Sequence, residues 1–274
     1  MTEAASGPVS EQASGPVSER ASGPVSEQVS GPVSQPVSGP VQTLFDARAA
    51  TWAAKYAPGG PLTGRRSRLA AAVSAHAGPG SRVLDLGCGS GDLARQLADA
   101  GLRVTGCDIS ARMLEQAERA DPAGTWVELD PAWRQLPFAA GAFAAIVASS
   151  VLEYVGDPDV VLRECARVLA PGGTLLCTVP DVRHPVRWLE WAAALGAPLL
   201  GPGGLRGPSR LQGYIDYLRV SRQRHGAQWW QATARRAGLD AAPPDAGAGA
   251  GSAAGRSPLR LLSFRKPSRP AGRP

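Results

Sequence analysis

Apolar and polar positions divide the chain into two regimes. Residues 5–40 repeat an octad of the type ASGPVSEQ, in which Gly-Pro and serine accompany few valines. Such a unit holds too little apolar area to offset the entropy of ordering it, and its regular prolines interrupt helices and strand ladders. We therefore predict a disordered octad-repeat linker over residues 1–40 rather than a solenoid. The folded domain is expected over residues 41–266, followed by a disordered basic tail over 267–274.

From residue 41 onward, segments of helical periodicity alternate with short apolar runs. Helical spacing and Gly/Pro stops predict helices at 41–57, 62–77, 92–100, 111–120, 158–169 and 228–237. Apolar runs bounded by turn residues predict strands at 82–86, 102–107, 125–129, 143–149, 174–179 and 259–264. Regular β-α alternation with near-continuous apolar strands is typical of a parallel sheet covered on both faces, so the predicted fold class is α/β, doubly wound.

A Gly-rich turn after the first strand is the strongest functional signal. In VLDLGCGSGDLA, residues 83–94, Asp85 lies near the strand end and three glycines follow at alternate positions. Glycines let the backbone turn sharply and let a ligand approach it, while the next helix points its free N–H groups into the same space. An acid within a buried strand also needs a partner. A plain strand-to-helix turn is the alternative interpretation.

The spacing of this turn distinguishes between ligands. A dinucleotide fingerprint, G-x-G-x-x-G, would need glycine where this chain has Asp92. Two nearby carboxylates suit a phosphate poorly and a cationic ligand well. Asp108, at the end of the second strand, can accept hydrogen bonds from the hydroxyls of a ribose. Its alternative role is in the N-cap region of the next helix, although Ser110 fits the N-cap better.

Taken together, DLGCGSGD, GCDIS, LPF, VLEYV and RVLAPGGTLLCTVP resemble, in this order and spacing, the class I S-adenosylmethionine-dependent methyltransferases of the small-molecule type. The resemblance covers roughly residues 44–266. It implies a Rossmann-like seven-stranded sheet whose last strand is antiparallel, with helices on both faces. It also implies S-adenosylmethionine as cofactor and methyl transfer by in-line displacement.

The resemblance also assigns roles to individual positions. It places Asp85, Gly87, Cys88, Gly89 and Gly91 around the methionine moiety and its sulfonium. It places Asp108 at the ribose, Ile109 on the adenine face, Asp130 near the adenine amino group and Ser149 facing the methyl donor. The chain departs from the family pattern at Ala132, where an acid is usual before LPF, and at Ala144, where aspartate is usual at the start of the fourth strand.

A general base is needed only if the acceptor keeps its proton until attack. Glu153, in SSVLEYV, and His184 are the candidates, because both follow strands whose carboxyl ends face the expected pocket. The alternative for Glu153 is a cap or an ion pair, and for His184 a structural role. Neither residue lies within a metal-binding motif, and we expect no metal site.

The segment 181–225 interrupts the alternation and is the expected acceptor lid. Seven arginines against Asp181, Glu190 and Asp216 give it a net charge of +4 (7 − 3), and tryptophans and tyrosines accompany them. Arginine suits carboxylate or phosphate, and aromatic rings suit flat or apolar groups. We therefore expect a small-molecule acceptor of acidic or amphipathic character. A helical cap with an Arg-rich outer face is the alternative.

Charge and cysteine content limit the remaining possibilities. The formal charge of +6 falls after Asp245, so the chain up to that residue is neutral and a nucleic-acid partner is not expected. No apolar run approaches the roughly 20 residues of a membrane span. The four cysteines lack metal-binding spacing, and a reducing cytoplasm suits them. The competing functions are a catalytically silent cofactor-binding protein, a nucleotide-dependent oxidoreductase and, with least support, a nucleic-acid methyltransferase.

Overall fold

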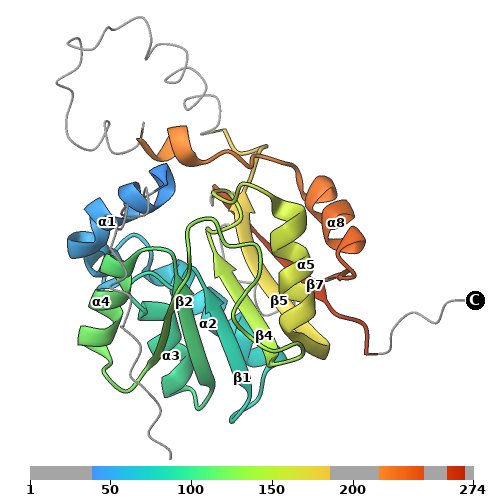
Figure 1. Cartoon of the computed structure of the whole chain (residues 1–274), viewed down its shortest axis with the longest axis horizontal. Coiled ribbons are helices and arrows are strands. Elements are labelled where there is room, and N and C mark those ends of the chain that lie inside the picture. The colour runs from blue at the N-terminus through green and yellow to red at the C-terminus, as the bar shows by residue number, and fades with distance from the viewer. Residues whose placement is uncertain (1–38, 186–215, 244–257, 269–274) are drawn as a thin grey trace, which may run out of the picture. The chain divides into compact units, whose positions relative to one another are not determined.

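The computed structural model describes residues 39–185, 216–243 and 258–268, and within them the chain forms one seven-stranded sheet (Figure 1). The strands are β1 (Arg82–Leu86), β2 (Arg103–Asp108), β3 (Thr125–Glu128), β4 (Phe143–Ser149), β5 (Leu169–Pro180), β6 (Asp240–Ala242) and β7 (Leu259–Arg265). Their spatial order is β3-β2-β1-β4-β5-β7-β6. Strands β1 to β5 pair in parallel, and β7 pairs antiparallel with both β5 and β6. This confirms the doubly wound α/β sheet with an antiparallel last strand.

The helices begin and end close to the positions that periodicity predicts. They are α1 (Pro40–Trp52), the 3-10 turn η1 (Ala53–Tyr56), α2 (Thr63–His76), α3 (Asp92–Asp99), α4 (Ala111–Ala120), α5 (Pro158–Val168) and α8 (Ala227–Arg236). Ser110 caps α4 by accepting the backbone N–H of Met113 at 3.1 Å, as the sequence predicted. Asp157 caps α5 in the same way through Val160 at 3.2 Å.

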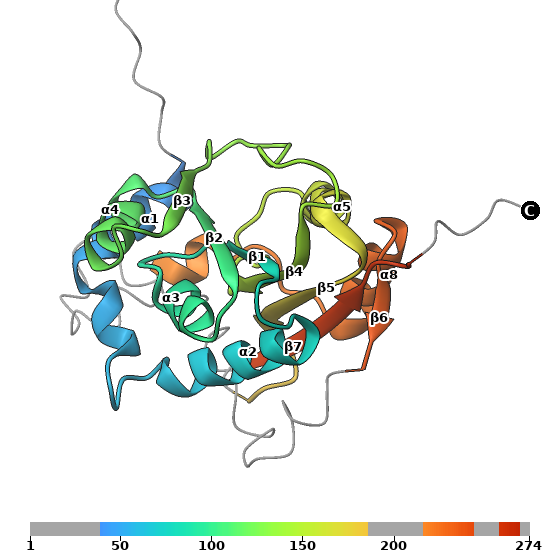
Figure 2. The same cartoon turned by 90° about the horizontal axis from the view of Figure 1, so that it is seen from below.

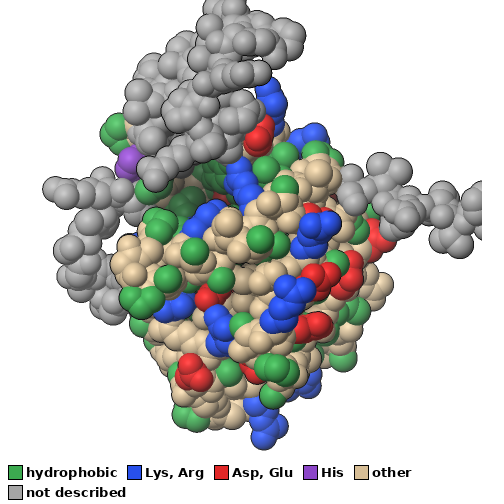
Figure 3. Space-filling view, turned by 90° about the vertical axis from the view of Figure 1, so that its left-hand side faces the viewer, with side chains coloured by type: hydrophobic (Ala, Val, Ile, Leu, Met, Phe, Trp, Pro, Cys, Tyr) green, Lys and Arg blue, Asp and Glu red, His purple; other side chains and the backbone are tan. Residues whose placement is uncertain are grey.

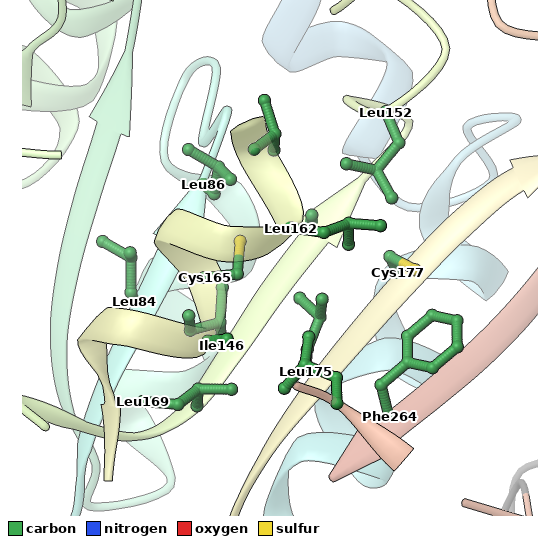
Figure 4. Packing of buried hydrophobic residues seen from close by; sticks show 14 of the residues in the cluster. Leu84, Leu86, Ile146, Leu152, Leu162, Cys165, Leu169, Leu175, Cys177 and Phe264 are labelled. Atoms are coloured by element: carbon green, nitrogen blue, oxygen red, sulfur yellow. The ribbon is translucent and has the colours of Figure 1, made fainter. Parts of the chain in front are cut away.

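Both faces of the sheet are covered, so strand residues of either parity are buried. On one face, Leu84, Ile146 and Leu175 belong to a core cluster with residues of α5 and α8, and Figure 4 shows the part of it below α5. On the other face, α2 and α3 cover Val83, Val147 and their neighbours. Figure 2 shows these two helical layers on opposite sides of the sheet. The continuous apolar runs of the sequence are therefore explained by burial on both sides.

Some predicted features differ from the structure or fall outside it. Strand β6 was not predicted, because Asp-Ala-Ala is a short segment without a large apolar residue. Strand β5 begins at Leu169 rather than residue 174, so the Pro-Gly-Gly segment belongs to it. The predicted linker lies outside the described residues except for its last two positions. Most of the predicted lid does too, because residues 186–215 are not described.

The described residues also bear on membranes and cysteines. No helix among them is both long and apolar enough to span a bilayer. Cys88, Cys107, Cys165 and Cys177 are all buried free thiols. Burial raises the pKa of each thiol, which keeps it protonated and unreactive at neutral pH.

The order of the strands fixes where a ligand can bind. Strand β1 lies between β2 and β4. The chain continues from β1 to β2 and β3 on one side, and then crosses to β4 and β5 on the other side, so the strand order reverses at β1. In open α/β sheets such a switch point opens a crevice at the carboxyl ends of the strands. The predicted ligand residues at the ends of β1, β2 and β4 therefore converge on a single crevice.

Candidate active site

The turn after β1 is built around three glycines in the left-handed conformation. Gly87, Gly89 and Gly91 have φ values of 71°, 55° and 74°. The backbone N–H groups of Gly87 and Cys88 donate to the carbonyl oxygen of Cys107 at 2.7 and 3.0 Å, which ties the turn to the end of β2. A Cβ at Gly91 would lie 2.5 Å from Trp126. The sequence therefore needs glycine here for both conformation and space.

Asp85 is the most unusual charged group at this crevice. Its side chain is 1% exposed, and its Oδ2 atom has no hydrogen-bond partner among the described residues. Burial, and secondarily the nearby Asp108 carboxylate, raise the pKa of Asp85 to about 7. A buried carboxylate oxygen without a donor is costly unless a ligand supplies one. The arrangement fits a cationic group such as an ammonium.

Asp108 holds the Gly-rich turn against β2. Its Oδ2 accepts the backbone N–H of Gly89 at 2.8 Å, and its Oδ1 accepts that of Ser110 at 2.9 Å. Burial raises the pKa of Asp108, while these backbone donors act in the opposite direction. The carboxylate keeps further lone pairs for a ligand, because each oxygen can accept more than one hydrogen bond.

These groups line one large cavity of about 1470 Å³. That exceeds the volume of roughly 300–1,000 Å³ typical of small-molecule sites, so it has room for a cofactor and a second small molecule. The sequence-predicted residues that line it are Asp85, Gly87, Cys88, Gly89, Asp108, Ile109 and Ser149. Gly91, Asp130, Glu153 and His184 are not part of its wall. Gly91 nevertheless contributes to the conformation of the turn, with its side away from the cavity packed against Trp126.

Asp130 does not face the cavity in this structure. Its side chain is exposed, and its Oδ1 accepts the backbone N–H of Ala132 at 2.7 Å within its own turn. Leu129 and Ala132 line the wall on either side of it. The surface next to Ile109 is therefore largely apolar, which suits the face of a planar base better than its polar edge.

The two proposed bases lie apart from the cavity wall. Glu153 is fully buried, and its Oε2 accepts hydrogen bonds from Tyr217 Oη at 2.7 Å and Ser221 Oγ at 3.3 Å. Its neighbour Tyr154 faces the cavity instead. His184 lies in a turn after β5, where its backbone N–H donates to the carbonyl oxygen of Asp181 at 3.0 Å. Catalysis by Glu153 or His184 stays a prediction.

Helix α1 and the turn η1 supply cavity residues that the sequence did not reveal. Trp52 lies over the Gly-rich turn, because a Cβ at Gly89 would be 3.1 Å from its indole nitrogen. Phe45 makes edge-to-face contacts with Trp52 and Tyr154, with ring centroids 5.5 and 5.2 Å apart. Asp46 accepts the hydroxyl of Ser110 at 2.5 Å, which fixes α1 to the start of α4. These contacts place α1 as a wall of the cavity.

Basic side chains from the same region also reach the cavity. Arg65, at the start of α2, donates to Ser150 Oγ at 2.6 Å. Ser150 has a φ of 56° and is the only non-glycine residue with a positive φ in the part of the chain that the structure describes. Lys55 Nζ lies 3.6 Å from the centroid of the Trp52 ring. In the sequence, Lys55 and Arg65 are basic residues within predicted helical segments. Helical periodicity alone does not show that their side chains face the cavity at the edge of the sheet.

Comparisons with known proteins find methyltransferase similarity over the central part of the chain. Residues 84–177 match the model of a methyltransferase domain family. The ubiquinone biosynthesis O-methyltransferase of Xanthomonas campestris pv. campestris is 38% identical over 101 residues, which cover 35% of this chain and 42% of that protein. The demethylmenaquinone methyltransferase of Renibacterium salmoninarum is 38% identical over 121 residues, covering 44% and 49%. The chain thus aligns with less than half of these relatives' lengths.

The fold extends the similarity beyond the aligned segment. The crystal structure of magnesium protoporphyrin IX methyltransferase from Synechocystis PCC 6803, with bound SAH, superimposes with a TM-score of 0.60 at 19% identity. That match covers 82% of this chain and 98% of the other. Residues 84–177 are therefore similar to a methyltransferase domain, and the described chain shares its fold with a solved structure of the class I S-adenosylmethionine-dependent methyltransferases. S-Adenosylmethionine is the cofactor of this class.

Proposed function

We propose that this chain binds S-adenosylmethionine at the turn after β1 and transfers the methyl group to a small-molecule acceptor. One observation supports this most directly. The buried Oδ2 of Asp85 lacks a donor, and it borders a cavity beside a glycine turn that leaves room for a ligand. A ligand with an ammonium group satisfies that oxygen, and the turn accepts the rest of the molecule against bare backbone.

The remaining parts of the cofactor find matching groups nearby. Asp108, on the adjacent strand, accepts hydrogen bonds from the ribose hydroxyls. Arg65 lines the same cavity and, like Asp85, lies close enough to Tyr56 to shift its pKa. Its guanidinium suits the carboxylate of the methionine moiety, since Arg forms paired hydrogen bonds with carboxylates. Ile109 and Leu129 provide an apolar surface for the adenine.

The chemistry follows from how these residues hold the reactants. When bound, the cofactor supplies a methyl group already activated by the sulfonium. The chain then needs to align an acceptor opposite that group and to exclude water. The rings of Phe45, Trp52 and Tyr154 contact one another and line the cavity near the turn, where they exclude water. Ser149, at the end of β4, borders the same space.

Two observations support a small molecule as the methyl acceptor. The two relatives are named a ubiquinone biosynthesis O-methyltransferase and a demethylmenaquinone methyltransferase, and both names refer to small molecules. The cavity has room beyond the cofactor. The acidic or amphipathic character expected from the arginines of 181–225 rests mainly on residues outside the described ranges, so it remains a proposal.

Isothermal titration tests cofactor binding, using S-adenosylhomocysteine (SAH) and NADH as ligands. We expect saturable binding of SAH and none of NADH, and the reverse would support a nucleotide-dependent oxidoreductase. Asp108→Ala is expected to weaken SAH binding by roughly 1–3 kcal/mol, the scale of a lost hydrogen bond to a charged group. Asp99→Ala, an exposed acid at the end of α3, is the matched control. Equal affinities of the two variants would remove Asp108 from the site.

Turnover requires a separate experiment. The full chain is incubated with isotopically labelled S-adenosylmethionine and fractionated metabolite extracts, and labelled products are detected by mass spectrometry. Label in a small molecule supports methyl transfer. Tight SAH binding without any labelled product would instead favour a catalytically silent cofactor-binding protein, the alternative that Ala132 and Ala144 suggest.

A further inference from the structure

One wall of the cavity carries a cluster of positive charge. Lys55 from η1, Arg48 from α1 and Arg65 from α2 all line the cavity. Lys55 and Arg65 form no ion pair within the described residues, and Lys55 instead lies over the ring of Trp52. Figure 3 shows blue basic side chains beside a recessed hydrophobic area of the surface. Such a concentration of like charges in a half-enclosed space attracts an anion.

The pKa of Lys55 reflects its burial and the neighbouring positive charges. Burial is the main cause that lowers the pKa of Lys55 to about 8, and the neighbouring Arg48 and Arg65 lower it further. No acid is among these causes, although Asp85 and Asp108 line the same cavity. An anion placed beside Lys55 would reverse the effect, because an opposite charge favours the protonated amine.

The cofactor does not supply a separate anion for Lys55. In the arrangement proposed above, Asp85 meets its ammonium group, Asp108 its ribose and Arg65 its carboxylate. The sulfonium adds a further positive charge to the cavity. Lys55, whose pKa is shifted by no acid, therefore still lacks an anionic neighbour when the cofactor is bound, and the second small molecule can supply one.

The surroundings of Lys55 describe the rest of that molecule. Phe45, Trp52 and Tyr154 form a connected set of edge-to-face rings in the same region. Tyr217 extends it, with its ring centroid 5.9 Å from that of Tyr154. Offset and edge-to-face ring contacts suit flat or apolar groups.

We propose that the methyl acceptor carries a carboxylate or phosphate that binds Lys55, with an apolar or aromatic body against Phe45 and Tyr154. This inference rests on the proposed function, since it names the acceptor class of the same site. It differs from a purely structural role of Lys55, in which the amine only packs on Trp52. If Lys55 binds the acceptor, small anions should raise its pKa. If Lys55 only packs on Trp52, they should leave its pKa unchanged.

The composition allows a direct test on the intact chain. Lys55 and Lys266 are its only lysines. Reductive methylation with ¹³C-formaldehyde therefore gives two lysine signals in NMR spectra, which a Lys55→Met variant assigns. All titrations are made with saturating SAH, so that the cofactor site, including Arg65, is already filled. The probes are benzoate, phenyl phosphate and the uncharged benzamide.

We expect benzoate or phenyl phosphate to raise the titration midpoint of the Lys55 signal by about one pH unit, which corresponds to about tenfold stronger binding to the protonated amine. Benzamide should leave the midpoint unchanged. The signal of Lys266, whose Nζ donates to the carbonyl oxygen of Leu169 at 2.7 Å, should not respond to any probe. Comparison of the two anions distinguishes a carboxylate from a phosphate acceptor.

Isothermal titration supplies the second readout. Benzoate or phenyl phosphate should bind the SAH complex at least about tenfold more weakly in Lys55→Met, while Lys55→Arg should retain the preference for an anion. SAH titration of each variant reports whether it folds. If SAH binds but the anions and benzamide bind alike, or Lys55→Met changes nothing, the anionic acceptor is refuted. If SAH itself does not bind, the proposed function fails first.

Discussion

Asp85 provides the sharpest test of the site, because its burial affects both ligand affinity and folding. The pKa of Asp85 is raised from 3.8 to about 7, chiefly by burial. A cationic ligand binds its ionised form, so SAH binding should strengthen as the pH rises through 7. With a pKa of 7, roughly one-tenth of the carboxylate is ionised at pH 6 and nine-tenths at pH 8. We therefore expect SAH to bind about tenfold more weakly at pH 6 than at pH 8.

Stability of the ligand-free protein should change in the opposite direction. Because the folded-state pKa lies above the unfolded value, the folded protein takes up a proton near pH 7, whereas the unfolded chain does so only near 3.8. Stability therefore rises as the pH falls from 7 towards 4. Between pH 8 and pH 5 this amounts to about 2.7 kcal/mol, two pKa units at 1.36 kcal/mol each.

The variant Asp85→Asn separates the two effects. It should lose the pH dependence of SAH binding and bind weakly throughout. Relative to the parent, its free energy of unfolding should be about 2.7 kcal/mol higher at pH 8 than at pH 5, because only the parent has to bury a charge at pH 8. Titration calorimetry and urea unfolding followed by tryptophan fluorescence measure the two quantities. Asp99→Asn, an exposed acid on α3, is the control. A parent affinity for SAH that is equal at pH 6 and pH 8 would refute the reasoning.

Two further variants test the turn and the buried glutamate. Gly91→Ala should destabilise the protein by about 2–5 kcal/mol, combining left-handed strain of roughly 1–2 kcal/mol with overpacking of roughly 1–3 kcal/mol against Trp126. Gly101→Ala is the control, because its φ of 86° is also positive but its nearest neighbour, Pro79, is 3.5 Å away, so thermal unfolding should show only the strain; equal losses would contradict the steric argument. Glu153→Gln should lower stability by about 1–3 kcal/mol through its bonds to Tyr217 and Ser221 and leave SAH affinity unchanged. Once an acceptor is known, a loss of kcat by 10² or more in Glu153→Gln would show that the carboxylate takes part in proton transfer.

The sequence predicted those parts of the fold that depend on local pattern. Apolar runs located β1 to β5 and β7, because strands buried on both faces must be almost continuously hydrophobic. The caps and glycine stops located the helices within a few residues. Strand β6 escaped, since its pairing with the edge of β7 is decided by tertiary contact and its own three residues carry no hydrophobic signal.

The candidate site was predictable where it follows from strand ends. Asp85, Asp108 and Ser149 each end or nearly end a strand, and the parallel sheet brings them to one edge. The walls contributed by α1 and η1 were not predictable in this way. Which face of a helix meets a cavity depends on how the helix is docked, and here that rests on long-range contacts such as Asp46 with Ser110 and Arg65 with Ser150.

The segment after β4 shows where such reasoning reaches its limit. Residues 150–155 have neither helical nor strand periodicity, so spacing alone cannot decide which of Glu153 and Tyr154 faces the ligand. The structure decides it through burial, because Glu153 turns inward to accept the hydroxyls of Tyr217 and Ser221. The backbone carbonyl oxygen of Glu153 also accepts the N–H groups of Arg222 and Gln223 at 2.9 and 3.1 Å. Glu153 thereby joins the end of β4 to the segment after residue 216, and this connection positions Tyr154 and Tyr217 on the cavity wall, where the acceptor is proposed to bind.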